Sequence, residues 1–332
     1  MSQAAAQSSA SASADVIVVG AGPAGSSAAY HMATLGLDVI LLEKQELGRD
    51  KVCGDGLTPS AVRELVSMGM DTTGWQRNRG LRVIGGGHLL HFPWPEQASF
   101  PSYGMARPRA LLDRDLAEHA AAAGARLLTG VTVTAPVTSP TGRVTGVEAR
   151  PTNRVAYPGI EGPTTFTAPL VVDAGGVSAR LATAVGRTKN ERRPMGVAVR
   201  AYFRSPRAQD AWMESRLELW DGAPGKSDLL PGYGWIWSVG EGLVNVGLGS
   251  VSSRAQATAI DYRAVFNRWM DNVPASWGFT KENQVGGLVS AALPMAFNRK
   301  PHYADGLMLL GDAGGMVSPF NGEGIAQALM SG

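Results

Sequence analysis

The chain has 332 residues, enough for two closely joined domains around a large core. Charged residues make up 17% of it, below the usual share of about 25%, and the formal net charge of +2 gives no electrostatic basis for binding nucleic acid. The single cysteine, Cys53, excludes an internal disulfide and a cysteine zinc cluster, and it favours a cytoplasmic protein. The five histidines show no ligand spacing, so we predict no metal site.

The first 14 residues are rich in Ala, Ser and Gln and contain neither a basic residue nor an apolar core. This composition predicts a disordered leader over residues 1–14 rather than a signal peptide. No later apolar run reaches about 18 residues, so any membrane contact should be peripheral.

A glycine motif follows the leader. An apolar strand is predicted over Val16–Val19, entering Gly20-x-Gly22-x-x-Gly25 and then a helix, and a second strand over Asp38–Leu42 ends at Glu43. Such glycines allow a tight turn and the close approach of a pyrophosphate, and a carboxylate at this distance suits an adenosine ribose. The alternative is a glycine-rich turn without a ligand. The predicted dinucleotide contacts are Gly20, Ala21, Gly22, Pro23, Ala24, Gly25, Glu43 and Lys44.

The middle of the chain alternates between helical and strand patterns. Residues 46–58 form a glycine-punctuated loop, and residues 80–103 suggest strands and turns. Residues 195–250 alternate apolar and polar side chains, which predicts a large antiparallel sheet. Helices are predicted at 59–68 and 109–123, and short strands at 126–128, 131–134, 144–149 and 170–173.

A second glycine motif near the end decides which dinucleotide is bound. A strand over Leu307–Leu310 stops at Gly311-Asp312-Ala313, and residues 319–325 open a helix. An Asp at a strand end suits the hydroxyls of a ribityl chain, which FAD has and NAD lacks, whereas the alternative is an exposed Asp in a plain strand-turn-helix. We therefore predict FAD, with contacts from Gly311, Asp312, Gly322, Gly324 and Ile325.

Three aromatic residues, Tyr233, Trp235 and Trp237, alternate along one predicted strand and should face one side of the sheet. They would either line a dry slot for an apolar substrate or pack as ordinary sheet-core aromatics. The sequence leaves both possibilities open.

Three segments carry a resemblance to a known family: RDKVCGDGLTP (49–59), PGYGWIW (231–237) and the GDA…NGEGIAQAL run. With them the chain resembles the geranylgeranyl reductase family of flavoproteins, and most closely its actinobacterial members that reduce the isoprenoid tail of menaquinone. The resemblance implies an α/β fold of the p-hydroxybenzoate-hydroxylase type: a Rossmann-like FAD-binding domain (15–80, 105–190 and 300–332) with an interleaved antiparallel-sheet substrate domain (81–104 and 191–299). The family's C-terminal helical region would be absent.

The resemblance also implies an activity. FAD would transfer a hydride from flavin N5 to a C=C bond of a polyprenyl or geranylgeranyl chain, with a proton added to the other carbon. Cys53, Tyr233 and Trp235 would be catalytic, and Tyr233, Trp235 and Trp237 would contact the lipid. Further FAD contacts would come from Cys53, Gly54, Asp55 and Gly56, from Arg109, and from Val133 at the adenine. NADPH or a ferredoxin-like protein would supply electrons, and the protein would be cytoplasmic, possibly on the inner face of the membrane.

Two positions depart from the family pattern. Trp237 and Ser238 stand where the family motif has Phe-Pro, and residues 173–176 read Asp-Ala-Gly-Gly where related flavoproteins carry Ala-Asp-Gly. Two other functions fit the same fold: an FAD-dependent monooxygenase or halogenase, and a non-catalytic protein that binds FAD or lipid.

Overall fold

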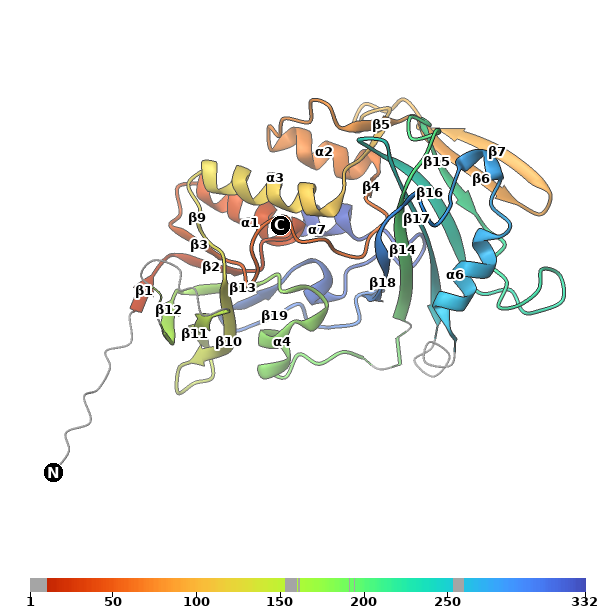
Figure 1. Ribbon diagram of the computed structural model, residues 1–332. Helices are drawn as coiled ribbons and strands as arrows, with labels where there is room; N and C mark the ends of the chain where they lie inside the picture. Colours follow the sequence, from red (N-terminus) through yellow and green to blue (C-terminus); the bar gives the residue numbers. More distant parts are fainter. Residues whose placement is uncertain (1–10, 153–159, 161, 191, 194, 253–259) are drawn as a thin grey trace.

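The computed structural model describes residues 11–332 except 153–159, 161, 191, 194 and 253–259. The described residues form a mixed α/β fold of four sheets with helices packed on two of them (Figure 1). The predicted fold class is therefore confirmed.

A six-stranded sheet in the order β19-β20-β13-β2-β3-β9 forms the middle layer of one half of the molecule. All its neighbouring strands are parallel except β19 and β20. Alternate side chains face an α1 and α3 layer on one side and a second sheet on the other, and both sides are buried. This explains the continuous apolar runs in the sequence. The bounds are β2 Val16–Val19, β3 Val39–Leu42, β9 Arg126–Leu128, β13 Leu170–Asp173, β19 Tyr303–Ala304, β20 Leu307–Leu309, α1 Pro23–Thr34 and α3 Arg109–Ala122.

The second sheet of this half corrects the predicted leader. Ser11–Ser13 form strand β1, which pairs in parallel with β12 (Thr164–Thr167), and the amide of Ala14 donates to Thr167 O at 3.1 Å. Backbone pairing at a sheet edge orders these residues despite their low-complexity composition, because it does not depend on side-chain type. Residues 1–10 of the predicted leader lie outside the described residues. The remaining strands of this sheet are β10 Val131–Thr138 and β11 Val144–Pro151.

The other half is built on a seven-stranded sheet in the order β18-β14-β17-β16-β15-β6-β7, antiparallel except for β15 and β6. It includes the sheet predicted over 195–250 and extends it with strands from both flanks of the chain. Helix α6 packs on one face. The bounds are β6 Gly80–Gly85, β7 His88–Pro93, β14 Met195–Arg204, β15 Trp212–Arg216, β16 Gly232–Gly240, β17 Leu243–Ser252, β18 Gln284–Pro294 and α6 Tyr262–Met270.

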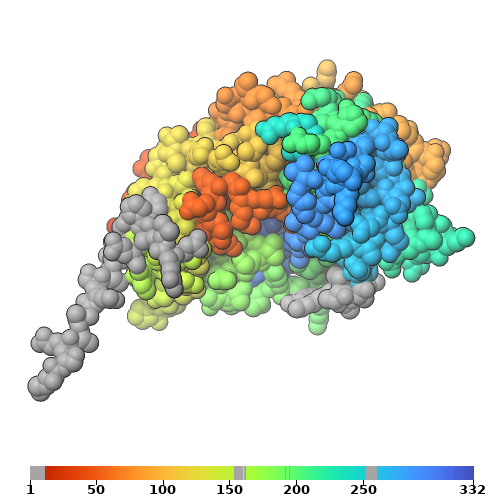
Figure 2. Space-filling view, viewed as in Figure 1, coloured from red at the N-terminus to blue at the C-terminus, as the bar shows by residue number. Residues whose placement is uncertain are grey.

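Smaller elements join the two halves. Helix α7 packs against α1 and α2, so segments from both ends of the sequence lie side by side (Figure 1). In the space-filling view, an orange-red segment from early in the chain borders blue segments from its last third (Figure 2). These elements are β4 Gly56–Leu57, β5 Gln76–Asn78, β8 Gly104–Ala106, α2 Pro59–Ser67, α4 Arg180–Ala184, α7 Ile325–Ser331 and the 3-10 helices Gly176–Ser178, Ala275–Trp277 and Gly311–Gly314.

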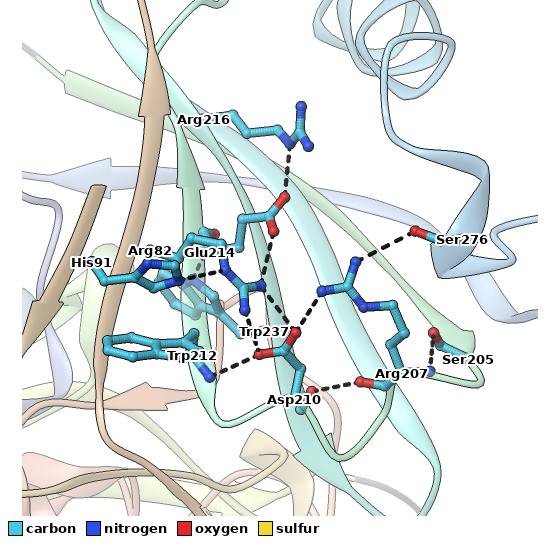
Figure 3. A network of polar contacts seen from close by, with 11 residues as sticks. Arg82, His91, Ser205, Arg207, Asp210, Trp212, Glu214, Arg216, Trp237 and Ser276 are labelled. Carbon is cyan, nitrogen blue, oxygen red and sulfur yellow. Dashed lines mark hydrogen bonds and ion pairs between the residues drawn. The ribbon is translucent and has the colours of Figure 1, made fainter. Parts of the chain in front are cut away.

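A network of ion pairs fixes the β6–β15 end of the large sheet (Figure 3). Arg82 on β6 donates to both carboxylate oxygens of Asp210, at 2.9 and 3.1 Å, and to Glu214 on β15 at 3.1 Å. Arg207 also donates to Asp210, at 2.7 Å. On β6, Arg82 alternates with Leu81 and Val83, which face the opposite side of the sheet and line the cavity. The network therefore holds the strands that carry part of the cavity described next.

Candidate active site

The glycines of the first motif have different tasks. Gly20 has a φ of +102°, and a Cβ there would lie 2.5 Å from Ala174 O; a Cβ on Gly25 would lie 1.8 Å from Gly20 O. Both positions therefore require glycine for the strand, turn and helix to pack. At Gly22, the N-cap of α1, a Cβ would meet only Lys51 Nζ, at 3.6 Å, and would project into an open cavity. The N-terminus of α1 thus faces free space, as phosphate binding requires.

Glu43 directly follows β3 and lines the same cavity. Its carboxylate accepts hydrogen bonds from the amides of Ala21 at 2.9 Å and Gln45 at 3.1 Å. These two bonds hold the side chain beside the glycine turn, where it can accept further bonds from ribose hydroxyls.

The loop before β4 carries charged groups that meet α3. Asp113 on α3 accepts from Lys51 Nζ at 2.5 Å and from two nitrogens of Arg109 at 2.8 and 3.0 Å. Loss of hydration acts in the other direction, but Arg109 and Lys51 together hold the pKa of Asp113 below its usual value. The two cations are therefore fixed by one carboxylate, and both border the cavity.

Asp55 is the buried centre of this loop. Its φ of +64° is unusual for a residue with a side chain, and its carboxylate accepts from the Arg109 amide at 3.1 Å, from Tyr202 Oη at 2.5 Å and from Asn245 Nδ2 at 2.7 Å. Burial raises the pKa of Asp55 to about 6, against the effect of the hydrogen bonds from Tyr202 and Asn245. Strands β14 and β17 of the large sheet thereby hold the loop in place.

Asp312 lies in the 3-10 helix Gly311–Gly314, which follows β20 in the second glycine motif, and it lines the cavity. In the described part of the chain, no hydrogen bond reaches its carboxylate. Burial raises the pKa of Asp312, and the charges of Arg109 and Lys51 partly offset this. A half-buried carboxylate without a donor suits the hydroxyls of a ribityl chain, since it offers only acceptors.

The three aromatic residues of β16 share one face, as the alternation predicted. The ring centroids of Tyr233 and Trp235 are 6.2 Å apart, and those of Trp235 and Trp237 are 5.7 Å apart. Trp235 lies over β17, where a Cβ on Gly247 would come within 2.3 Å of the indole ring. The three rings form a continuous row along one wall of the cavity.

The cavity has a volume of about 1610 Å³ and runs from the glycine turn to the aromatic row. This exceeds the upper end of the usual range of small-molecule sites, about 1,000 Å³. The predicted residues that line it are Gly20, Gly22, Pro23, Ala24, Glu43, Lys44, Cys53, Gly54, Asp55, Gly56, Arg109, Val133, Tyr233, Trp235, Trp237, Asp312, Gly322, Gly324 and Ile325. Three predicted contacts, Ala21, Gly25 and Gly311, do not line it. Their backbone lies at the packed interface of strand and helix instead, with a Cβ on Gly311 only 3.0 Å from that of Ala24.

Sequence reasoning missed the polar residues on the large sheet that face the loop. Tyr202 and Asn245 bind Asp55, and Arg200 donates to Lys51 O at 3.0 Å. The only signal was a polar side chain within an otherwise apolar strand, and its partner lies about 150 or more positions away along the chain. The apolar side of the cavity was also larger than predicted, with Leu81, Val83, Ala198, Met213, Leu217 and Leu293 added to the aromatic row.

These observations fit FAD. The glycine turn with the open N-terminus of α1 would hold the pyrophosphate, Glu43 the ribose and Asp312 the ribityl chain. The loop around Cys53 would then lie between the flavin and the aromatic row, because it lines the cavity between the glycine motifs and contacts Trp237 through Gly54 and Gly56.

The fold and the site thus define a flavin-binding oxidoreductase, and the model of the FAD binding domain family matches residues 13–331. The chain is 39% identical to the menaquinone reductase of Mycolicibacterium smegmatis and 38% identical to that of Mycobacterium tuberculosis H37Rv. In both comparisons 96% of this chain is matched, to 74% and 75% of the relative. The chain belongs to the geranylgeranyl reductase family of flavoproteins, as its sequence motifs predicted.

Solved structures agree at the level of fold. A geranylgeranyl bacteriochlorophyll reductase-like protein from Thermoplasma acidophilum matches with a TM-score of 0.77 at 24% identity, over 96% of this chain and 76% of that one. The myxobacterial chondrochloren halogenase matches with a TM-score of 0.73 at 22% identity, over 96% and 72% of the two chains. At these identities both show the common fold alone.

Proposed function

We propose that this protein is an FAD-dependent reductase that saturates a C=C bond in the polyprenyl tail of a lipid, with the tail of menaquinone as the first substrate to test. The observation that carries the proposal is one continuous cavity, which joins a polar end bordered by both glycine motifs to an apolar end walled by Tyr233, Trp235 and Trp237. A site for soluble aromatic substrates would not need so long an apolar extension. The identity to menaquinone reductases supports the choice of lipid.

When bound, FAD would supply the hydride. The residues of this chain would bind the tail and donate the proton. An isolated alkene is unactivated, so protonation builds positive charge on carbon. The faces of Trp235 and Tyr233 can stabilise that charge by about 0.5–2 kcal/mol per ring, depending on desolvation. They also keep water away from the reacting carbons, because the rings and their neighbours form an apolar wall.

Cys53 is the proposed proton donor. Its Sγ accepts from the amide of Asp55 at 3.3 Å. Burial raises the pKa of the Cys53 thiol, although Arg109 acts against this, so Sγ holds its proton at neutral pH. Burial likewise raises the pKa of Tyr233 to about 12, and its hydroxyl donates to Asn321 O at 2.8 Å. The neutral thiol of Cys53 can therefore donate a proton to the substrate, whereas the hydroxyl proton of Tyr233 is already used in the bond to Asn321 O.

The proposal extends to the organisation of the chain and its partners. We assign FAD binding to residues 15–80, 105–190 and 300–332, and tail binding to 81–104 and 191–299. The electron donor would be NADPH or a ferredoxin-like protein. Among the described residues, no helix is long and apolar enough to cross a membrane. Because the proposed substrate is a lipid, we also propose peripheral contact with a membrane surface.

The test is a single turnover without oxygen. The FAD-loaded protein is reduced, mixed with detergent-solubilised menaquinone, and followed by flavin absorbance. The mass of the lipid is measured after its head group has been returned to the quinone form in air, so that two added hydrogens report on the tail. We expect flavin reoxidation together with a gain of two hydrogens in the tail. Reoxidation that requires oxygen, with a hydroxylated or halogenated product, would instead support the monooxygenase or halogenase alternative. If no polyprenyl lipid reoxidises the reduced flavin, the result would support the third alternative, a non-catalytic protein that binds FAD or lipid.

A further inference from the structure

The side chain of Asn245 connects the aromatic row of β16 to the loop before β4, which carries Cys53 and Asp55. Asn245 lies on β17 and is fully buried. Its Nδ2 donates to Cys53 O and to Asp55 Oδ2, each at 2.7 Å, and its Oδ1 accepts from Trp235 Nε1 at 2.8 Å. Both amide hydrogens and the amide oxygen therefore form hydrogen bonds. One partner lies on strand β16, and the other two lie in the loop before β4.

Only an amide of this length satisfies all three partners. The indole of Trp235 can only donate, whereas Cys53 O and the carboxylate of Asp55 can only accept, so the contact needs an acceptor on one side and two donors on the other. A carboxylate at this position would face that of Asp55, and an aliphatic side chain would leave buried polar groups without partners. Asn245 itself does not line the cavity, so any influence on the reaction must pass through its neighbours.

The loop depends on such external bonds for its conformation. Asp55 adopts a left-handed backbone conformation that is unfavourable for a residue with a side chain. Gly54 and Gly56, on either side of it, lie against the ring of Trp237. Without the bonds from Asn245 and Tyr202, little in the local sequence would keep Cys53 at its present place.

We propose that Asn245 is a positioning residue, which sets the location of the Cys53 thiol relative to the ring of Trp235. Its part in catalysis rests on the proposed function above, but its effect on the thiol does not. The inference can therefore be tested on the protein without any lipid.

Cys53 provides the readout, because it is the only cysteine in the chain. The FAD-loaded protein is treated with iodoacetamide, and the alkylation rate is measured by mass spectrometry. In Asn245→Leu we expect alkylation about tenfold faster than in wild type, since the two hydrogen bonds that close the loop are lost and local opening becomes easier.

Asn78→Leu is the matched control. Asn78 is also buried, and its Oδ1 accepts from Trp94 Nε1 at 2.7 Å, but it makes no bond to the loop. Both variants should lose thermal stability, whereas only Asn245→Leu should change the alkylation of Cys53. Equal alkylation rates in the two variants would overturn the inference.

Asn245→Asp keeps the shape of the side chain, and it provides a second test of the inference if Asn245→Leu does not fold. The new carboxyl retains the acceptor for Trp235 but faces Asp55, with Cys53, Arg109, Arg200 and Tyr202 as the other ionisable groups around it. At pH 8 we expect alkylation several-fold faster than in wild type, since both carboxylates are charged. At pH 5 the ratio to wild type should fall toward one, because a protonated carboxyl can again donate to Asp55. A ratio of one at both pH values would contradict the inference.

Turnover of a polyprenyl substrate separates this inference from the proposed function. If the wild type reduces the tail, Asn245→Leu should lower kcat about tenfold or more with a smaller change in KM, since the misplaced group acts in the chemical step. If the wild type reduces no polyprenyl lipid while the alkylation difference persists, the proposed function fails and the positioning role stands. If turnover is present but kcat is unaffected, the part of Asn245 in catalysis is refuted, whereas its effect on the position of the thiol is decided by the alkylation rates alone.

Discussion

The carboxyl of Asp55 should make a measurable contribution to the pH dependence of stability. Burial raises the pKa of Asp55 from 3.8 to about 6, so between these values the folded protein binds more protons than the unfolded chain. Ionising Asp55 is thus harder in the folded state, and its contribution to the free energy of unfolding falls as pH rises from about 4 to about 6. A difference of roughly two pKa units corresponds to about 3 kcal/mol.

Asp55→Asn removes this ionisation while keeping the shape of the side chain. The variant will have a constant cost from the altered hydrogen bonds with Tyr202 and the Arg109 amide, but that cost does not depend on pH. We therefore compare the two proteins at each pH between 4 and 7 by urea denaturation at one saturating FAD concentration. The free energy of unfolding of the variant minus that of wild type should increase by about 2.5 kcal/mol across this range, since the remainder develops below pH 4.

The carboxyls of Asp173 and Asp312 also have raised pKa values, but they are present in both proteins and cancel in the difference. If the free energy of unfolding depends on pH in the same way in variant and wild type, burial does not disfavour the charged form of Asp55. The description of Asp55 as a buried carboxyl at the centre of the loop would then be wrong.

Three further predictions concern the cavity. Gly54→Ala places a Cβ 2.3 Å from the ring of Trp237 and should lower the free energy of unfolding by about 1–3 kcal/mol, whereas Gly287→Ala, with open space around it, should have little effect in the same urea titration. Asp312→Ala should weaken FAD binding by about 1.5–3 kcal/mol through lost bonds to the ribityl hydroxyls, as a fluorescence titration would measure; unchanged affinity would remove Asp312 from the FAD site. Trp235→Ala should lose a few kcal/mol of tail binding, at about 25 cal/mol per Å² of apolar surface, and Trp235→Phe should retain more binding while still slowing flavin reoxidation by the alkene. Wild-type binding and turnover in both Trp235 variants would identify the strand as plain core.

Much of the fold could be predicted because its signals are local. Three strands of the parallel sheet, β2, β13 and β20, are short apolar runs that enter glycine turns. The helix expected at 109–123 is observed as Arg109–Ala122, and the strand expected at 170–173 is observed over those residues. The leader was predicted less well, since β1 is ordered by pairing with β12 more than 150 residues away.

The polar part of the site could not be predicted for a related reason. The loop's side-chain partners on the large sheet, Arg200, Tyr202 and Asn245, lie on strands that periodicity identifies only as sheet. Periodicity tells which face of a strand a residue occupies, but it does not tell what that face meets in the folded chain. Only the packing of the large sheet against the loop before β4 makes Asp55 a buried carboxylate and Asn245 its donor.

The departure of Trp237 from the family's Phe acquires a physical explanation from the same packing. The indole Nε1 donates to Glu214 O at 3.1 Å, a bond that Phe cannot make, and the six-membered ring occupies the space left by Gly54 and Gly56. Glu214 is in turn held by Arg82 and Arg216 on the other face of the sheet (Figure 3). The larger ring is therefore matched to both of its neighbours, the glycine loop on one side and the ion-paired strand on the other. This position closes one end of the aromatic row, so the substitution affects the shape of the apolar cavity while leaving the FAD-binding motifs as they are.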